Sequence, residues 1–235
     1  MADIVLNGDT SGAITVSAPA VAGTNTLTLP ATTGTVLDDN SSLDAANLTG
    51  ALPAISGASL TGLTASQMPA GSVLQVISGE KGSTFVGTSV DDNGGYFIDV
   101  TGYSATITPA STSNKILVTV HAYIGQTTVA GGYQQSLRIR QGTNYPFAGT
   151  SEGGRPTTSA RVSNYVGNTH WMGMISGSWL HSPSSTSALT YQVQLGGYSA
   201  SPIVYLNRSE AFQVFGTGNY DTMPLSTITL MEIAG

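Results

Sequence analysis

The stretch KILVTVHAYI, residues 115–124, decides the fold class. Val, Ile, Thr and Tyr dominate it, and β-branched and aromatic side chains favour strands over helices. Six further strand-like runs stand on either side of it, separated by Gly, Pro, Ser and Asn. They are residues 73–77, 96–98, 136–140, 189–195, 203–206 and 226–233. So many short strands without a helical pattern predict an all-β sandwich of the jelly-roll type.

Composition excludes several classes of protein. Only 9% of the 235 residues are charged, against about 25% in most soluble proteins, so an ordinary helical enzyme is not expected. No stretch approaches the roughly 20 apolar residues of a transmembrane helix, and no membrane insertion is predicted. The start, Met1–Val5, lacks the pattern of a secretory signal, so synthesis in a cytoplasm is expected. Absence of Cys excludes disulfides, and the net charge of −6 argues against nucleic-acid binding.

The chain divides into two parts of unlike chemistry. Residues 1–71 contain no aromatic residue, no Lys, no Arg and no His, whereas all seven basic residues lie at Lys81 or later. An arm without aromatics buries little apolar volume, so it needs other chains to become ordered. We therefore predict an extended β arm that docks on another protein at 1–37, a stalk at 38–72 and a β-sandwich head at 73–235.

The arm carries an alternating pattern. Residues 13–18 and 26–29 place apolar and polar side chains in turn, which is typical of strands with one buried face. We expect these two segments to pair as a hairpin and to add their edge to the sheet of a docking protein. The predicted docking side chains are Ile14, Val16, Leu27 and Leu29.

The segment 38–72 contains a near-repeat. Asn47-Leu48-Thr49-Gly50 recurs twelve residues later as Ser59-Leu60-Thr61-Gly62. Small residues spaced by single leucines suit a thin stalk in which three backbones approach one axis, whereas a flexible linker would leave those leucines in water. The pattern favours the stalk, with Leu48, Leu52, Leu60 and Leu63 packing around the axis of a homotrimer.

Three stretches carry a resemblance to a known family. They are NTLTLPATTGTVL at 25–37, LTGALPAISG at 48–57 and STITLME at 226–232. They resemble the tail fibres and short-fibre virion proteins of tailed bacteriophages, of the aquatic or cyanobacterial type. The resemblance implies a homotrimer in the virion that docks on the tail, baseplate or capsid by its N-terminus and points its C-terminal head outward. The short chain leaves a baseplate fibre or a capsid decoration as further interpretations.

No motif for catalysis or metal binding is found in the sequence. Asp91–Gly95 resembles part of a calcium loop but lacks the downstream Glu, so its pattern favours a tight turn between strands. The three histidines, His121, His170 and His181, have none of the short spacings that pre-form a metal site. No Gly-x-Ser-x-Gly occurs. We predict no cofactor and no enzyme activity.

A glycan-cleaving tailspike is the remaining enzymatic interpretation. It would need paired carboxylates in a groove, for which Asp99, Glu152, Glu210 and Asp221 are present. With so few acids, some proximity is expected by chance, and depolymerising spikes are usually much longer. We therefore rank this activity below binding.

Loops rich in Tyr, Asn and Arg suit adhesion, because these side chains combine flat contact area with hydrogen bonds. Arg138 and Arg140, two apart on one strand face, are expected to pair with carboxylates of a neighbouring chain. The predicted receptor is a host-surface glycan or an envelope protein; a capsid decoration would have none. The predicted receptor-binding residues are Tyr145, Arg155, Tyr165, Tyr198, Asn207 and Arg208.

Overall fold

The computed structural model describes residues 4–7, 12–16, 24, 31, 64–91, 96–125, 134–163, 169–197, 203–212 and 222–235. The chain forms two compact units, Met1–Ala58 and Ser59–Gly235. No helix in these described ranges is long and apolar enough to cross a membrane.

The first unit contains one antiparallel pair, β1 (Ile4–Asn7) with β2 (Ala13–Val16). The strand predicted at 13–18 is confirmed over Ala13–Val16, whereas its pairing with residues 26–29 stays a prediction. One neighbour of β2 is β1, with Ile4 opposite Val16 and Asn7 opposite Ala13, and Gly12, just before β2, adopts a φ of +81°. Ile14 and Val16 thus lie on β2. Residues 26–29, with Leu27 and Leu29, and the stalk leucines Leu48, Leu52, Leu60 and Leu63 lie outside the described residues.

The second unit is a domain of antiparallel strands, and its strands all lie in the predicted head, residues 73–235. The unit begins with a short 3-10 helix, Ala65–Gln67. Its strands are β3 (Val73–Lys81), β4 (Phe85–Thr88), β5 (Val90–Asp91), β6 (Tyr96–Ile107), β7 (Lys115–Gly125), β8 (Gln134–Gln141), β9 (Ala160–Ser163), β10 (Met172–His181), β11 (Leu189–Gly197), β12 (Ile203–Leu206) and β13 (Ser226–Ile233).

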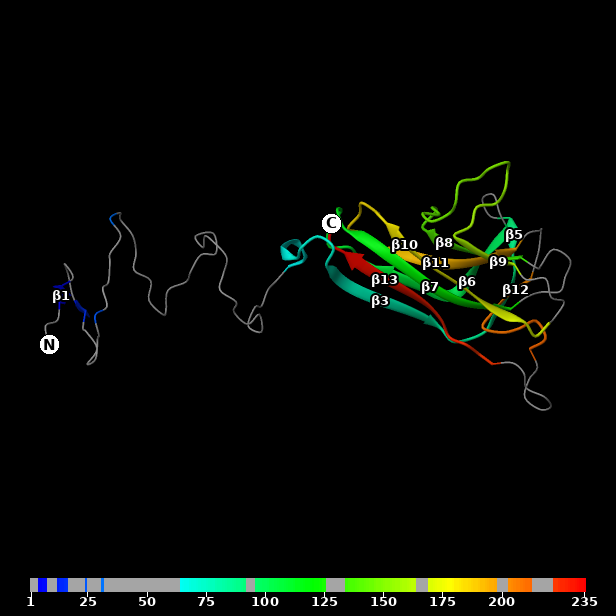
Figure 1. Cartoon of the computed structure of the whole chain (residues 1–235), viewed down its shortest axis with the longest axis horizontal. Coiled ribbons are helices and arrows are strands. Elements are labelled where there is room, and N and C mark those ends of the chain that lie inside the picture. Colours follow the sequence, from blue (N-terminus) through cyan, green and yellow to red (C-terminus); the bar gives the residue numbers. More distant parts are fainter. Residues whose placement is uncertain are drawn as a thin grey trace. The chain divides into compact units, whose positions relative to one another are not determined.

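The long strands pair in a nested order. The first, β3, pairs with the last, β13; inside them β6 pairs with β11, β7 with β10, and β8 with β9. One sheet runs β3-β13-β7-β10, with β12 and β4 continuing it beside the end of β7, and the other runs β5-β6-β11-β8-β9 (Figure 1). This nesting is the jelly-roll topology. The predicted all-β sandwich is confirmed.

The core lies between the two sheets. The alternate residues of β7 are fully buried, and Leu137 and Ile139 of β8 meet them from the other sheet. These residues of β7 are Ile116, Val118, Val120, Ala122 and Ile124. The alternation of the strands therefore gives each sheet an inner, apolar face and an outer face. It is the two outer faces that differ in chemistry.

Backbone hydrogen bonds close one end of the head, where Gly71 N donates to Ala234 O at 2.8 Å and Ala234 N donates to Ser72 O at 2.9 Å. We call this the entry end, because the chain enters β3 here. The C-terminus and the start of β3 lie together in Figure 1. Glu232, fully buried nearby, accepts hydrogen bonds from Asn114 Nδ2 and Ala110 N, both at 2.6 Å.

The turn predicted at Asp91–Gly95 also fits the fold. β5 and β6 pair antiparallel on either side of it, with Val90 opposite Phe97 and Asp91 opposite Tyr96. Residues 92–95 themselves lie outside the described residues.

Candidate ligand-binding site

Two arginines mark the outer face of the five-stranded sheet. Along β8, Leu137 and Ile139 point into the core. Arg138 and Arg140 alternate with them and therefore point away from it. The sequence spacing of the two arginines thus places both on one face, as expected.

The strand register adds two polar residues to this face. Gln194 of β11 lies opposite Arg138 on one side and opposite Asp99 of β6 on the other. Three neighbouring strands therefore align a guanidinium, an amide and a carboxylate. Arg138 Nε donates to Gln194 Oε1 at 2.9 Å, and Gln194 Nε2 donates to Asp99 Oδ1 at 2.8 Å.

A bulge in β6 follows directly after Asp99. Asp99 pairs with Gln194 and Ser104 with Gln192, so four residues of β6 oppose one residue of β11. Within the bulge Gly102 has a φ of +75°, a conformation that glycine adopts without strain. The Gln192 amide satisfies the freed backbone by donating to Val100 O at 2.9 Å. Bulges of this kind re-aim side chains near binding sites.

Arg138 is the most deeply held charge of this face. Its side chain is 0% exposed. The guanidinium carbon lies 3.9 Å from the ring centroid of Phe97 and 3.8 Å from that of Tyr145, so the cation is stacked between two aromatic rings. Gly196 makes room beneath the Phe97 ring, because an added Cβ would come within 2.6 Å of the ring carbon Cδ1.

A tight turn brings Tyr145 into place. Gln141 and Asn144 exchange two backbone hydrogen bonds of 2.9 Å, and between them Gly142 has a φ of +59°. Arg140 Nη1 donates to Gly142 O at 2.8 Å, which fastens the turn to the sheet. The turn after β8 therefore folds back over the outer face and covers Arg138.

These elements enclose a pocket of about 530 Å³. At one side Arg140 pairs with Asp99; these side chains are 31% and 44% exposed, so both reach solvent. Apolar side chains form part of the wall, and a hydroxyl and an amide add polar groups. The lining residues are Val90, Phe97, Ile98, Asp99, Arg140, Gly142, Thr143, Tyr145 and Gln194.

The pocket combines an apolar wall with a few converging polar groups, as small-ligand sites do. Asp99 accepts hydrogen bonds, Arg140 donates them, and Thr143 does both. The rings of Phe97 and Tyr145 add flat apolar surface. The arrangement suits a ligand that carries several hydroxyl groups on an apolar frame.

Arg138 is fully buried within its own chain, so the expectation that it pairs with a neighbouring chain is wrong, whereas for Arg140 that expectation stays a prediction. Arg138 is stacked between two rings of its own chain, and Arg140 pairs with Asp99 of its own chain. The partner Asp99 lies 41 residues away in sequence and becomes a neighbour only through the strand order β6-β11-β8.

The predicted receptor-binding residues have different positions in the structure. Tyr145 lines the pocket. Arg155 is exposed in the loop after β8 and is not among the lining residues. Arg208 is partly exposed, and its guanidinium lies 4.8 Å from the ring centroid of Phe212. Tyr165 and Tyr198 lie outside the described residues.

Asn207 does not lie on the surface. It is 0% exposed and adopts a φ of +56°, a left-handed conformation that Asn tolerates better than most residues. Its Nδ2 donates to Lys81 O at 2.5 Å, and its Oδ1 accepts a hydrogen bond from Ser226 Oγ at 2.6 Å. It therefore fastens strand ends together and is not accessible to a receptor.

The histidines are dispersed in the head. His121 and His170 are exposed, while His181 Nδ1 lies 2.8 Å from the Tyr191 hydroxyl oxygen. Burial lowers the pKa of His181. Within the part of the chain that the structure describes, no three His, Asp or Glu side chains gather in a way that would hold a metal ion.

Comparisons with known proteins give no family. No family model matches the chain, and no curated protein matches it. Among solved structures, the chain is similar to the VP2 subviral particle of infectious bursal disease virus, with 13% identity and a TM-score of 0.27. The match covers 68% of this chain and 37% of that protein. A likeness this remote carries no argument about function.

Proposed function

We propose that the protein is a structural virion fibre of a tailed bacteriophage, a homotrimer that docks by its N-terminal arm and binds the host surface with its head. The observation that carries the adhesive role is the pocket around Asp99, Arg140, Thr143 and Tyr145. The fibre resemblance of residues 25–37 and 48–57 supports the virion role.

A surface glycan fits the pocket best. Sugars present hydroxyl groups that both donate and accept, together with an apolar ring face that packs on aromatic side chains. Asp99 and Arg140 offer an acceptor and a donor side by side. Contacts of this kind are weak singly, and three linked heads would raise the avidity by roughly 10²–10⁴-fold.

Binding without cleavage is the role that the chemistry supports. Glycosidic bond cleavage uses two carboxyl groups on either side of the bond. Among the described residues that line the pocket, Asp99 is the one carboxylate. We therefore propose an adhesin and not an enzyme.

Polysaccharides extracted from bacterial envelopes provide the test. The full chain, immobilised on a sensor, should bind at least one of them, and Asp99→Ala or Thr143→Ala should weaken that binding by at least tenfold. Arg155→Ala, outside the pocket, should bind normally. Equal binding by the wild type and both pocket variants would remove the pocket from the site. Binding to no envelope fraction would favour a capsid decoration protein instead.

Removing residues 1–37 tests the docking role separately. We expect the shortened chain to be absent from assembled particles while its polysaccharide binding persists, because the pocket lies wholly in the head. Particles that still contain the shortened chain would place the anchor elsewhere.

A further inference from the structure

The other outer face of the head, on the sheet β3-β13-β7-β10, carries an apolar row. In the strand register Met231 of β13 lies opposite both Val76 of β3 and Leu117 of β7, and Leu117 lies opposite Leu180 of β10. Four neighbouring strands thus place four apolar side chains in one line. Val76 and Leu180 are each 54% exposed, and Met231 and Leu117 are partly exposed.

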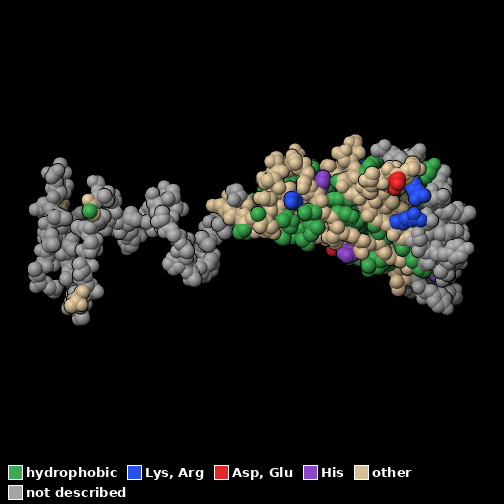
Figure 2. Space-filling view, turned by 45° about the horizontal axis from the view of Figure 1, so that its top comes forward, with side chains coloured by type: hydrophobic (Ala, Val, Ile, Leu, Met, Phe, Trp, Pro, Cys, Tyr) green, Lys and Arg blue, Asp and Glu red, His purple; other side chains and the backbone are tan. Residues whose placement is uncertain are grey.

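A further apolar pair lies beside this row, nearer the entry end. Ile233 lies opposite Val73, which is 50% exposed, and Lys115 stands on its other side. Figure 2 shows hydrophobic side chains gathered over β3, β13 and β7 at this end of the head. Soluble monomers seldom expose a contiguous apolar patch unless something binds it.

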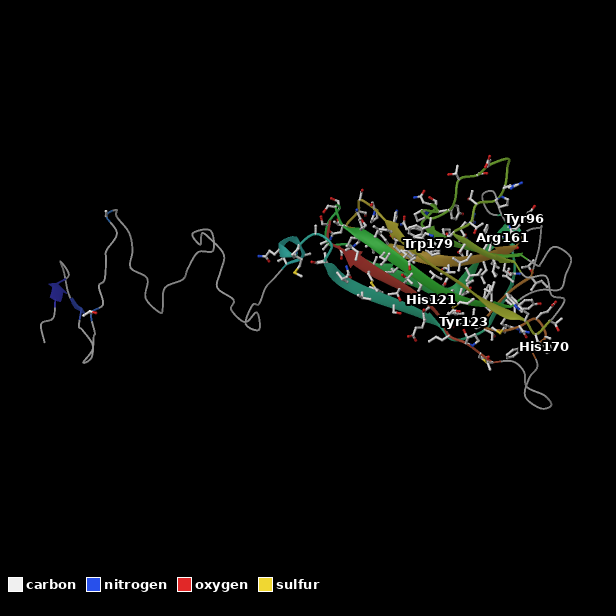
Figure 3. The ribbon with its side chains drawn as sticks, in the orientation of Figure 1. Tyr96, His121, Tyr123, Arg161, His170 and Trp179 are labelled. Atoms are coloured by element: carbon white, nitrogen blue, oxygen red, sulfur yellow. The ribbon has the colours of Figure 1, made fainter. Side chains whose placement is uncertain are left out.

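Away from the entry end, the next row holds hydroxyl groups only. Thr229 lies opposite Ser78 and Thr119, and Thr119 lies opposite Ser178. Thr119 Oγ1 and Ser178 Oγ are 2.8 Å apart. Besides Lys115 beside Ile233, the nearest charged or titratable side chains of this face are Glu80 and His121, one row further on. His121 and Tyr123 follow each other along β7 in Figure 3.

The chain itself enters the head beside this patch. Residues 64–72 lead directly into Val73. Thr64, Ala65, Met68, Val73 and Leu74 line a further groove of about 220 Å³. In residues 1–63 every charged side chain is an Asp, the last of them Asp44, so the approach to the patch is uncharged from residue 45 onward.

We infer that the apolar row Val76-Met231-Leu117-Leu180 is the surface through which a second copy of this chain packs against the head. The inference rests on the proposed homotrimer and names its interface. Copies joined through residues 1–63 are tethered at the entry end, which is where the row lies. Around a three-fold axis the same row of each copy can face the axis, where the apolar and hydroxyl rows bring no like charges together.

Thiol protection tests this inference without changing the fold. The chain has no Cys, so one introduced thiol gives one signal. In purified protein no other kind of protein is present to cover it. We expect Val76→Cys and Leu180→Cys, each in the full chain, to react with a maleimide at least tenfold more slowly than Met223→Cys. Met223 is the matched control, because it is 57% exposed and lies outside the row.

Mass measurement on the same samples separates the outcomes. A multimer with slow thiols at Val76 and Leu180 supports the interface, and Met231→Asp should then raise both reaction rates by at least tenfold. A multimer whose thiols all react at the Met223→Cys rate overturns the interface and leaves the trimer proposal standing. A single-chain mass at micromolar concentration overturns both.

Discussion

The two outer faces of the jelly roll arise from the same alternation of side chains and yet have opposite characters. On the five-stranded sheet, Arg138 points outward but is 0% exposed, because a turn folds over it and two rings enclose it. On the other sheet, Val76 and Leu180 are both 54% exposed. One face thus buries a charge and the other exposes apolar surface. The difference teaches that the loops, and not the strand pattern, decide which face becomes a ligand site.

The largest effect is expected from Arg138→Ala. The substitution leaves space between Phe97 and Tyr145 and removes the donor to Gln194 Oε1. We expect the free energy of unfolding to fall by about 3 kcal/mol. Urea titration measures it, and Arg155→Ala on the exposed loop should stay within about 0.5 kcal/mol of the wild type. Equal midpoints for the two variants would mean that the stacked cation adds nothing to stability.

Glu232→Gln should have the next largest effect. Glu232 is buried at the entry end, between the two outer faces. Its carboxylate accepts hydrogen bonds from the side chains of Asn114 and Gln75 and from the Ala110 N–H. In Glu232→Gln one acceptor oxygen of the carboxylate becomes an NH2 group, so a buried donor faces another donor. We expect this to lower the free energy of unfolding by about 1–3 kcal/mol. The shift of the urea midpoint at pH 7 measures this cost. An unchanged midpoint would show that water replaces the lost acceptor.

The same carboxylate predicts a pH dependence. Burial raises the pKa of Glu232, but hydrogen bonds from Asn114, Gln75 and Ala110 outweigh it and hold the pKa below its ordinary value of 4.5. A lowered pKa in the folded state means that the carboxylate stabilises the fold fully above pH 4.5. This contribution is lost as the pH falls through the lowered value. Unfolding midpoints measured from pH 7 down to pH 3 should drop less steeply in Glu232→Gln than in the wild type.

Asp99→Asn tests whether the polar outer face serves ligand binding more than stability, because the two effects can be measured separately. The Arg140–Asp99 pair is 31% and 44% exposed, so solvent screening limits its contribution to about 1 kcal/mol or less. Polysaccharide binding should nevertheless fall severalfold, since the ligand loses a charged acceptor. A melting scan beside the sensor measurement checks both. A large loss of stability with normal binding would make Asp99 a structural residue only.

The smallest effect is expected from Thr119→Val in the hydroxyl row. Its hydrogen bond to Ser178 faces solvent, and Val keeps the shape and the strand preference of Thr. The unfolding midpoint should correspond to a change below about 0.5 kcal/mol. A larger loss would show that this hydroxyl row is covered, and would bear on the interface inferred for that face.

The sequence predicts the strands better than their partners. Residues 115–124 and 226–233 are strands almost to the residue, because both runs are rich in β-branched side chains. In contrast, β6 was expected only at 96–98 and extends to Ile107. Gly102 interrupts its alternation, and the amide that completes the bulge comes from Gln192 on another strand. Contacts between distant residues of this kind leave no local signal.

The same reason limits prediction of the site. The spacing of Arg138 and Arg140 correctly indicates a shared face, but Asp99, their polar partner, joins them only through the jelly-roll order. Asn207 was expected in a receptor loop, and its residue type does signal a turn. Whether such a turn is exposed or closed depends on Lys81 and Ser226, which come from strands on either side of it in sequence.

The joining of Ser72 to Ala234 at the entry end has a mechanical consequence. Hydrogen bonds between antiparallel strands run across the strands, and β3 pairs with β13 along nearly its whole length. If the arm holds the particle while the pocket holds a surface, the pull enters the head along β3. The load is then shared as shear by all the backbone hydrogen bonds between β3 and β13 at once, and they do not open one by one. The time to rupture is therefore set by the unfolding rate of the head under tension.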